Sequence, residues 1–232
     1  MATGFANADT TEVNSDNASE FSSMISFGAM EERIEIEDSG GWYFVPQIGL
    51  SMIGDVTYPE GKFAINTTTD ISFDNGLFFG VGIGFELGKN ISLQLDVTTQ
   101  KNDVNLDTNL IHTDTGGDWM ISGHLEQTPV ILNLIWRGGD GESVKPHLGV
   151  SIGSTYCDSS LTVTDDGVFR SSGGPYKFGD DGWNMSYGFT AGIGIDMSPT
   201  SNLYFNYRYL HVDYDDEPLD VHNVGIGISF RF

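Results

Sequence analysis

Five charged side chains stand alone within long segments of alternating apolar residues, at positions that otherwise hold small or polar residues. They are Glu86, Asp96, Asp196, Arg208 and Arg231. Unpaired charge is costly wherever bulk water is excluded, so such residues are usually paired. We therefore expect the two arginines and three carboxylates to form ion pairs inside the fold, with His147 nearby.

An acid-rich segment near the carboxy terminus is a second candidate for chemistry. It contains Asp213, Asp215, Asp216 and Glu217. Clustered carboxylates suit calcium, a hard cation that prefers oxygen ligands, although the spacing is not that of an EF-hand loop. The segment predicts either a calcium site or a solvated acidic loop, and no other metal or cofactor is predicted.

One pair of residues has the types needed for acid–base catalysis. His211 and Asp213 lie two positions apart, but no serine follows them within that segment. A nucleophile and its base must lie within hydrogen-bond reach of each other. The remaining histidines show no metal-ligand spacing. Because the segment has neither a nucleophile beside the pair nor a metal site, we predict that the chain is not an enzyme.

The elements that hold these residues repeat with a period of two. Large apolar side chains alternate with small or polar ones, which indicates strands, because helices repeat near every 3.6 residues. No helix is needed from residue 42 onward. The segments run over residues 42–52, 78–87, 91–98, 130–136, 146–153, 186–197, 203–210 and 223–232.

Apolar side chains at every second position, up to the terminal Phe232, are typical of strands with one face against lipid and the other lining a narrow lumen. The chain has no run of about 18 apolar residues that could form a spanning helix. A closed barrel is the other structure that crosses lipid with every backbone polar group paired. Glycines on the inner face would relieve crowding, since eight strands leave room for little more than side chains.

The connections between the predicted strands alternate in length. Short ones at 88–90, 137–143 and 198–201 alternate with long polar ones at 55–76, 101–118, 155–182 and 213–220. Outer-membrane barrels have short periplasmic turns and longer external loops. The sequence therefore predicts an all-β fold, an eight-stranded antiparallel up-and-down transmembrane β-barrel over residues 41–232, with both termini on the periplasmic side.

Residues 1–40 differ in composition from the rest of the chain. They are rich in Asp, Glu, Ser and Asn, with Arg33 as the one basic residue. Such a composition favours a mostly irregular segment. We expect an acidic periplasmic segment, and Ala6-Asn7-Ala8 resembles the end of a signal peptide, so residues 1–8 are a candidate remnant of one.

Overall charge narrows the range of partners. The formal net charge is −23, with 33 acidic and 10 basic residues, so nucleic acid is excluded because its phosphates would be repelled. Cys157 is the single cysteine and cannot form an internal disulfide. We expect it to be a passive residue.

The chain resembles the eight-stranded outer-membrane barrel superfamily of Gram-negative bacteria. The resemblance is carried by Thr128–Leu134, Val144–Gly153, Tyr207–His211 and Phe232. Related proteins include the OmpA-like transmembrane domain, opacity-protein adhesins and porin-like surface antigens. The resemblance implies an outer-membrane location among lipid and lipopolysaccharide, and an assembly signal at Phe232 that the barrel-assembly machinery reads. It also implies self-association or a surface protein as a candidate partner.

Two functions fit this prediction. The barrel would be a structural anchor in the cell envelope, displaying acidic loops for adhesion, assembly or envelope integrity, or a narrow channel for small solutes or apolar molecules. Asp96 and Arg208 should lie near mid-height, with the other three charged residues near the periplasmic mouth. A plug of ion pairs favours the anchor. A gate, in which the charges change partners, favours the channel.

Overall fold

The computed structural model describes residues 41–58, 69–105, 110–112, 118–139, 143–165, 176–178, 181–214 and 217–232. The prediction for residues 1–40 lies outside this part of the chain. Every regular element within it is a β-strand. The strands are β1 (Trp42–Ile53), β2 (Val56–Tyr58), β3 (Thr69–Ile71), β4 (Gly76–Glu86), β5 (Ile91–Asp103), β6 (Leu110–His112), β7 (Asp118–Arg137), β8 (Val144–Asp165), β9 (Tyr176–Phe178), β10 (Asp181–Ser198), β11 (Ser201–Val212) and β12 (Leu219–Arg231).

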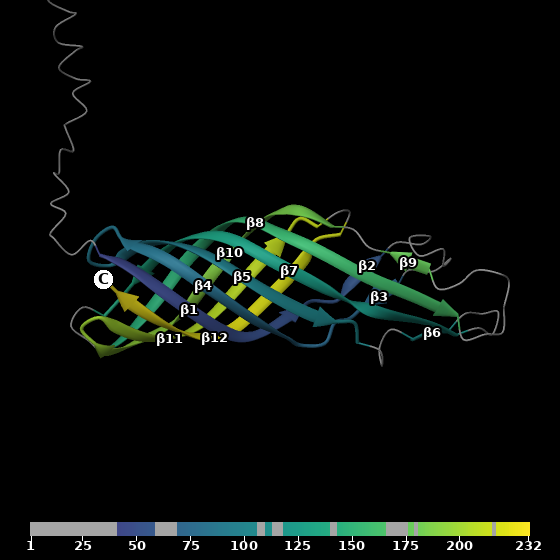
Figure 1. Cartoon of the computed structure of the whole chain (residues 1–232), viewed down its shortest axis with the longest axis horizontal. Helices are drawn as coiled ribbons and strands as arrows, with labels where there is room; N and C mark the ends of the chain where they lie inside the picture. The colour runs from purple at the N-terminus through teal and green to yellow at the C-terminus, as the bar shows by residue number, and fades with distance from the viewer. Residues whose placement is uncertain are drawn as a thin grey trace, which may run out of the picture. The chain divides into compact units, whose positions relative to one another are not determined.

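Eight of these strands close into a barrel. In the described residues, β1, β4, β5, β7, β8, β10, β11 and β12 pair antiparallel in chain order, and β1 also pairs with β12 to close the cylinder. Figure 1 shows the strands running obliquely around the barrel. The predicted fold class is confirmed. No helix long and apolar enough to cross a membrane occurs among the described residues.

Side chains alternate between the two faces of the barrel wall as predicted. Along β5 every second residue is buried, from Ser92 to Asn102, while the residues between them are exposed. The exposed set is apolar from Ile91 to Val97 and becomes polar at Thr99. The apolar stretch of β5 is the part of the strand that faces hydrocarbon. It ends just after Val97.

Two prolines interrupt the hydrogen-bond ladders without ending their strands. Pro46 lies in β1 beside a gap in the pairing with β12, and Pro129 lies in β7 beside a gap in the pairing with β5. A proline has no N–H to donate, so one ladder position is lost at each site. The register is the same on both sides of each gap, because the neighbouring pairs hold the strands in place.

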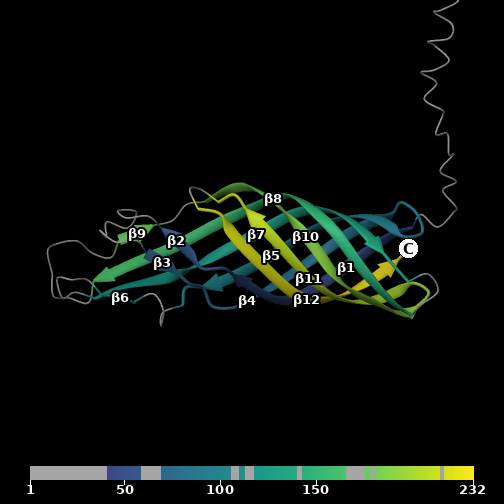
Figure 2. The same ribbon diagram turned by 180° about the vertical axis from the view of Figure 1, so that it is seen from behind.

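The connections at the carboxy-terminal end of the barrel are short. Those after β4, β7 and β10 all lie there, and Gly139 in the second of them has a φ of 79°, which favours glycine. The small strands β2, β3, β6 and β9 lie at the opposite end, as Figure 2 shows from behind. In an outer-membrane barrel the long connections are external.

Two strands extend furthest beyond their predicted ranges. β7 begins at Asp118 and β8 continues to Asp165, and Trp119 to Arg137 pair continuously with Asp165 to His147. Parts of the predicted loops 101–118 and 155–182 are therefore strand. The prediction relied on apolar side chains on the outer face, and those end where hydrocarbon ends. Backbone hydrogen bonds need no lipid, so the ladder continues beyond it.

Candidate functional site

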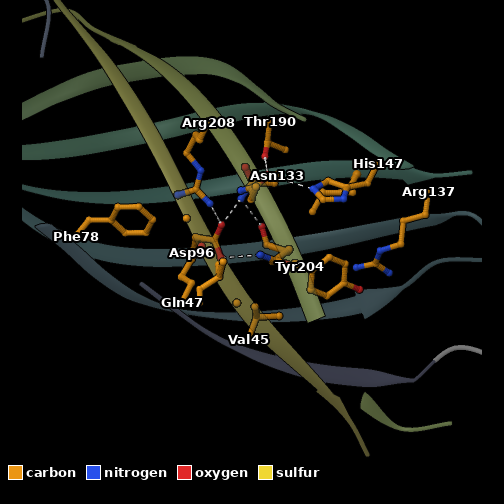
Figure 3. A pocket seen from close by; sticks show the side chains of 16 residues that line it. Val45, Gln47, Phe78, Asp96, Asn133, Arg137, His147, Thr190, Tyr204 and Arg208 are labelled. Atoms are coloured by element: carbon orange, nitrogen blue, oxygen red, sulfur yellow. Dashed lines mark hydrogen bonds and ion pairs between the residues drawn. The ribbon is translucent and has the colours of Figure 1, made fainter. Parts of the chain in front are cut away.

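A buried ion pair crosses the centre of the lumen. Arg208 of β11 donates from Nη2 to Oδ2 of Asp96 on β5, and the two side chains are 4% and 1% exposed. Gln94 Nε2 donates to Asp96 Oδ1 at 2.7 Å, and Asn133 Nδ2 donates to Oδ2 at 2.9 Å. Ser151 Oγ in turn donates to Asn133 Oδ1 at 2.7 Å. Three donors thus compensate the buried carboxylate (Figure 3).

A glycine opposite the carboxylate makes room for this cluster. Gly82 of β4 pairs with Asp96, and a Cβ atom there would lie 2.3 Å from Asp96 Oδ1. Any larger residue at Gly82 would displace the carboxylate from its partners. The glycine-rich inner face of this strand is therefore shaped to fit the ion pair.

A second group of charges lies nearer the short connections. Glu86 Oε1 is 3.0 Å from Arg231 Nε and 3.4 Å from Arg137 Nη1. Asp196 is paired instead with Lys145, at 2.7 Å between Oδ2 and Nζ. Of the five predicted residues, the structure thus brings together Asp96 with Arg208 and Glu86 with Arg231. It pairs Asp196 with a lysine that the sequence analysis did not select.

Arg137 is the important lumen residue that the sequence analysis missed. Its guanidinium carbon lies 4.9 Å from the centre of the Tyr43 ring and 5.6 Å from that of Tyr204, and its side chain is only 12% exposed. Two aromatic faces and Glu86 therefore hold the cation. The alternation could have revealed it, because Arg137 lies an even number of residues after Asn133, whose side chain points inward from β7. The sequence analysis assigned Arg137 to a turn instead.

A ladder of side-chain amides lies on the external side of the ion pair. Gln100 Nε2 donates to Gln127 Oε1 at 2.5 Å, and Asn223 Nδ2 donates to Gln100 Oε1 at 3.0 Å. Gln127 Nε2 lies 3.8 Å from Cys157 Sγ, and that free thiol is fully buried. Strands β5, β7, β8 and β12 are thereby cross-linked through the lumen by neutral groups.

The external end of the lumen is filled by apolar side chains, which the sequence analysis did not predict. Buried residues from six strands and one connection form this cluster, and Phe73 packs against it. This apolar cluster narrows the lumen, beside the buried polar pairs Ser51–Asn102 and Thr155–Ser186 at the same height. Its members are Ile53, Val56, Leu125, Ile131, Cys157, Leu210, Val212, Tyr214, Leu219 and Val221.

A small cavity remains between the central ion pair and the periplasmic charges. Its volume is about 40 Å³, and Gln47, Arg137, His147 and Arg208 are among the residues that line it. Figure 3 shows these side chains around the space. One water needs about 10–15 Å³ measured in this way, so the cavity has room for only a few water-sized particles.

His211 and Asp213, the pair considered for acid–base chemistry, lie on the outer surface of the barrel. His211 Nδ1 is 2.8 Å from Asp220 Oδ1, whereas its Nε2 is 3.6 Å from Asp213 Oδ1. Tyr209 also donates to Asp220 Oδ1, at 2.8 Å. The histidine is thus bound mainly to Asp220, a residue that the sequence analysis did not consider.

The predicted calcium segment is only partly described. Asp215 and Asp216 lie outside the described residues, and Glu217 donates its backbone N–H to Tyr214 O at 3.1 Å. Within the described ranges, no group of three or more His, Cys, Asp or Glu side chains is arranged to hold a metal ion. Calcium binding at this segment remains a prediction.

Phe232 lies at the seam where the barrel closes. Its backbone N–H donates to Trp42 O at 3.0 Å, and its side chain is 78% exposed. Its role as an assembly signal remains a prediction.

A family model matches the carboxy-terminal part of the chain. Residues 128–232 match the family model described as outer membrane protein beta-barrel domain. This range begins within β7 and continues through β8, β10, β11 and β12 to the last residue. No curated protein matches the sequence.

Several solved structures are similar to the chain. Neisserial surface protein A is 13% identical, with 82% of this chain and 97% of that chain covered and a TM-score of 0.49. Ail, the attachment invasion locus protein of Yersinia pestis, is 14% identical, with 82% and 99% covered and a TM-score of 0.45. The outer membrane protein AlkL is 18% identical, with 83% and 90% covered and a TM-score of 0.42. At these identities no residue role is transferred from them.

Proposed function

We propose that this chain, an eight-stranded β-barrel of the bacterial outer membrane, is a closed anchor that displays external strands and loops at the cell surface. The observation that carries the proposal is the filled lumen. The surface function would be adhesion, assembly or envelope integrity, and it would lie in the external part, because binding residues concentrate on loops positioned by a rigid scaffold.

Three layers of side chains oppose conduction. A solute would have to pass the Glu86 charges, the Asp96–Arg208 pair and then the apolar layer around Leu125 and Leu210. Separating a buried ion pair costs about 3–5 kcal/mol when one partner is left without compensation. The apolar cluster would still narrow the lumen after that. The narrow-channel alternative therefore has less support than the anchor.

The external extension supports display. We use this name for β6, β9, residues 118–127 of β7 and residues 157–165 of β8, which lie beyond the apolar outer band. At its base Asp158 pairs in register with Glu126 on one side and Asp181 on the other. Adjacent like charges repel, so a basic partner surface would be favoured by charge complementarity.

Electrical recordings test the closed lumen. Purified protein in planar lipid bilayers should give no defined conductance, and Arg208→Ala and Glu86→Ala should also stay closed because the apolar layer remains. A known porin inserted under the same conditions is the control for insertion and recording. Steady unitary conductance in the wild type would refute the anchor proposal.

Truncation tests the display role. Asp103 pairs with His124 and Asp158 pairs with Asp181, so residues 104–123 and 159–180 can each be replaced by an Asn-Gly turn without changing the register below. The shortened barrel should still fold. In nanodiscs of neutral lipid it should bind a lysine-rich peptide more weakly than the full chain does. Equal binding by both proteins would count against the external extension as the binding region.

A further inference from the structure

The small lumen cavity is lined by N–H groups that have no hydrogen-bond partner. They are Nε2 of Gln47, Nε of Arg137 and Nε of Arg208, and Nδ1 of His147 is also without a partner. These residues come from β1, β7, β11 and β8, so side chains of four strands surround one space. Figure 3 shows them on different sides of it.

These groups are too deeply buried to be satisfied by bulk solvent. The side chain of Arg208 is 4% exposed, that of Arg137 is 12% exposed, and His147 is 5% exposed as a residue. Buried donors in native proteins are almost always paired with protein or with a bound group. The cavity is therefore built to hold something that accepts hydrogen bonds.

The carboxylate of Asp96 and the Oδ1 atom of Asn206 are already engaged, whereas His147 Nδ1 can still accept one hydrogen bond when Nε2 carries the ring proton toward Asn206. Asp96 receives hydrogen bonds from Gln94, Asn133 and Arg208. Asn206 Oδ1 accepts a hydrogen bond from Thr190 Oγ1 at 2.6 Å and lies 3.1 Å from His147 Nε2. Among the described residues, every buried side-chain atom that lines the cavity and has no partner is a nitrogen.

Charge favours an anion over water alone. Arg137 and Arg208 line the cavity with Asp96, and Glu86, which pairs with Arg137, is shared with Arg231, so three arginines face two carboxylates in these linked groups. A water molecule would bring O–H groups that also need acceptors. An anion only accepts, and its charge is compensated by the guanidinium groups.

We propose that the lumen cavity binds a small monovalent anion of halide size, between the Arg137–Tyr204 side and the Arg208–Asp96 pair. The cavity volume of about 40 Å³ admits a monatomic anion with a little water but excludes large organic acids. Gln47 on β1 and Arg137 on β7 supply donors from strands that β4 and β5 separate in the wall. The anion completes the plug, because it joins the periplasmic and central charge groups into one network.

Bromide is the probe that tests this site directly. Crystals of the full chain grown in sodium bromide should show an anomalous peak within hydrogen-bond distance of Arg137 Nε and Gln47 Nε2. Ordered water without anomalous signal in the cavity would overturn the proposal. So would bromide peaks confined to the protein surface.

Stability in different salts gives an independent test. At equal ionic strength the Tm of the detergent-solubilised barrel should be higher in bromide or chloride than in gluconate, which is too large for the cavity, because a bound anion stabilises the folded state. Gln47→Leu removes one donor and no charge, and it should weaken the apparent bromide affinity by about tenfold or more. An equal halide response in wild type and Gln47→Leu would refute the assignment of the site.

A matched control is available within the same lumen. Thr98 Oγ1 is also buried without a partner, but Thr98 does not line the cavity. Thr98→Val should keep the full halide response. If Gln47→Leu does not fold, the anomalous peak in the wild type still decides between anion and water.

Discussion

Arg208 and Asp96 form an ion pair across the barrel lumen although 112 residues separate them in the chain. Each lies on a strand that has no ladder with the other, since β5 pairs with β4 and β7 while β11 pairs with β10 and β12. The contact is therefore made through the interior of the closed sheet. The ion pair joins opposite walls of the barrel, so substitutions at these two residues test what holds the fold together.

Removing one member of this pair should be strongly destabilising. Arg208→Met leaves the Asp96 carboxylate buried without its cation, and we expect a loss of about 3–5 kcal/mol in the free energy of unfolding. Urea unfolding of barrels inserted in lipid vesicles measures it. Asp96→Leu combined with Arg208→Met should cost less than the sum of the single changes. Lys145→Met breaks a more exposed pair and should cost no more than about 1 kcal/mol.

A methyl group at Gly84 should disturb the periplasmic end of the lumen. A Cβ atom there would lie 2.1 Å from Cζ of Tyr43, a fully buried ring whose hydroxyl donates to Ser92 at 3.1 Å. Gly84→Ala should therefore destabilise the barrel by about 1–3 kcal/mol, as overpacking does. Gly88→Ala is the control, since nothing lies within 4 Å of that position. An effect of equal size at both glycines would contradict the proposed steric cause.

Membrane orientation can be tested by cysteine labelling of intact cells. Met120 in the external extension is 43% exposed, so Met120→Cys should react with a membrane-impermeant maleimide. Lys89→Cys, in the short connection after β4, should react only after the outer membrane is permeabilised. Cys157 is fully buried and should stay unlabelled in both proteins. Labelling of Lys89→Cys but not of Met120→Cys on intact cells would reverse the assignment.

The carboxyl of Glu126, beyond the apolar band, should titrate below its ordinary range. Lys101 Nζ donates to Glu126 Oε1 at 2.9 Å, and this hydrogen bond is the main cause of the lowered pKa. A pKa lowered on folding means that the stabilisation is present above the unfolded value and is lost as pH falls through the folded one. Both side chains are about half exposed, at 48% and 50%, so the contribution should stay under about 1 kcal/mol.

Carbon-13 NMR of labelled glutamate measures this pKa. Lys101→Met should raise the pKa of Glu126 toward its ordinary value. Thr99→Val, one outward position closer to the membrane on β5, is a matched control that should leave the value unchanged. A Glu126 pKa that does not respond to the loss of Lys101 would show that the hydrogen bond is not its cause.

The alternation of side chains predicted the barrel correctly because it is a local property of strands. Ile91 to Val97 could be assigned to the outer face, and Asp96 to the inner face, from neighbouring residues alone. Local patterns failed where lipid ends. Residues 119–127 of β7 continue the ladder beyond the regular apolar alternation, and the sequence analysis assigned them to no strand.

The sequence by itself determined that the chain forms a closed antiparallel barrel and which face of each strand its residues occupy, since both follow from a period of two and from the need to pair every backbone group in lipid. Only the tertiary structure decided which inward-facing residues contact each other. Arg137 lies between Tyr43 and Tyr204, and Asp196 is paired with Lys145, because register and closure set which inward residues share a height. Register depends on all eight strands together, so no segment of the sequence contains it.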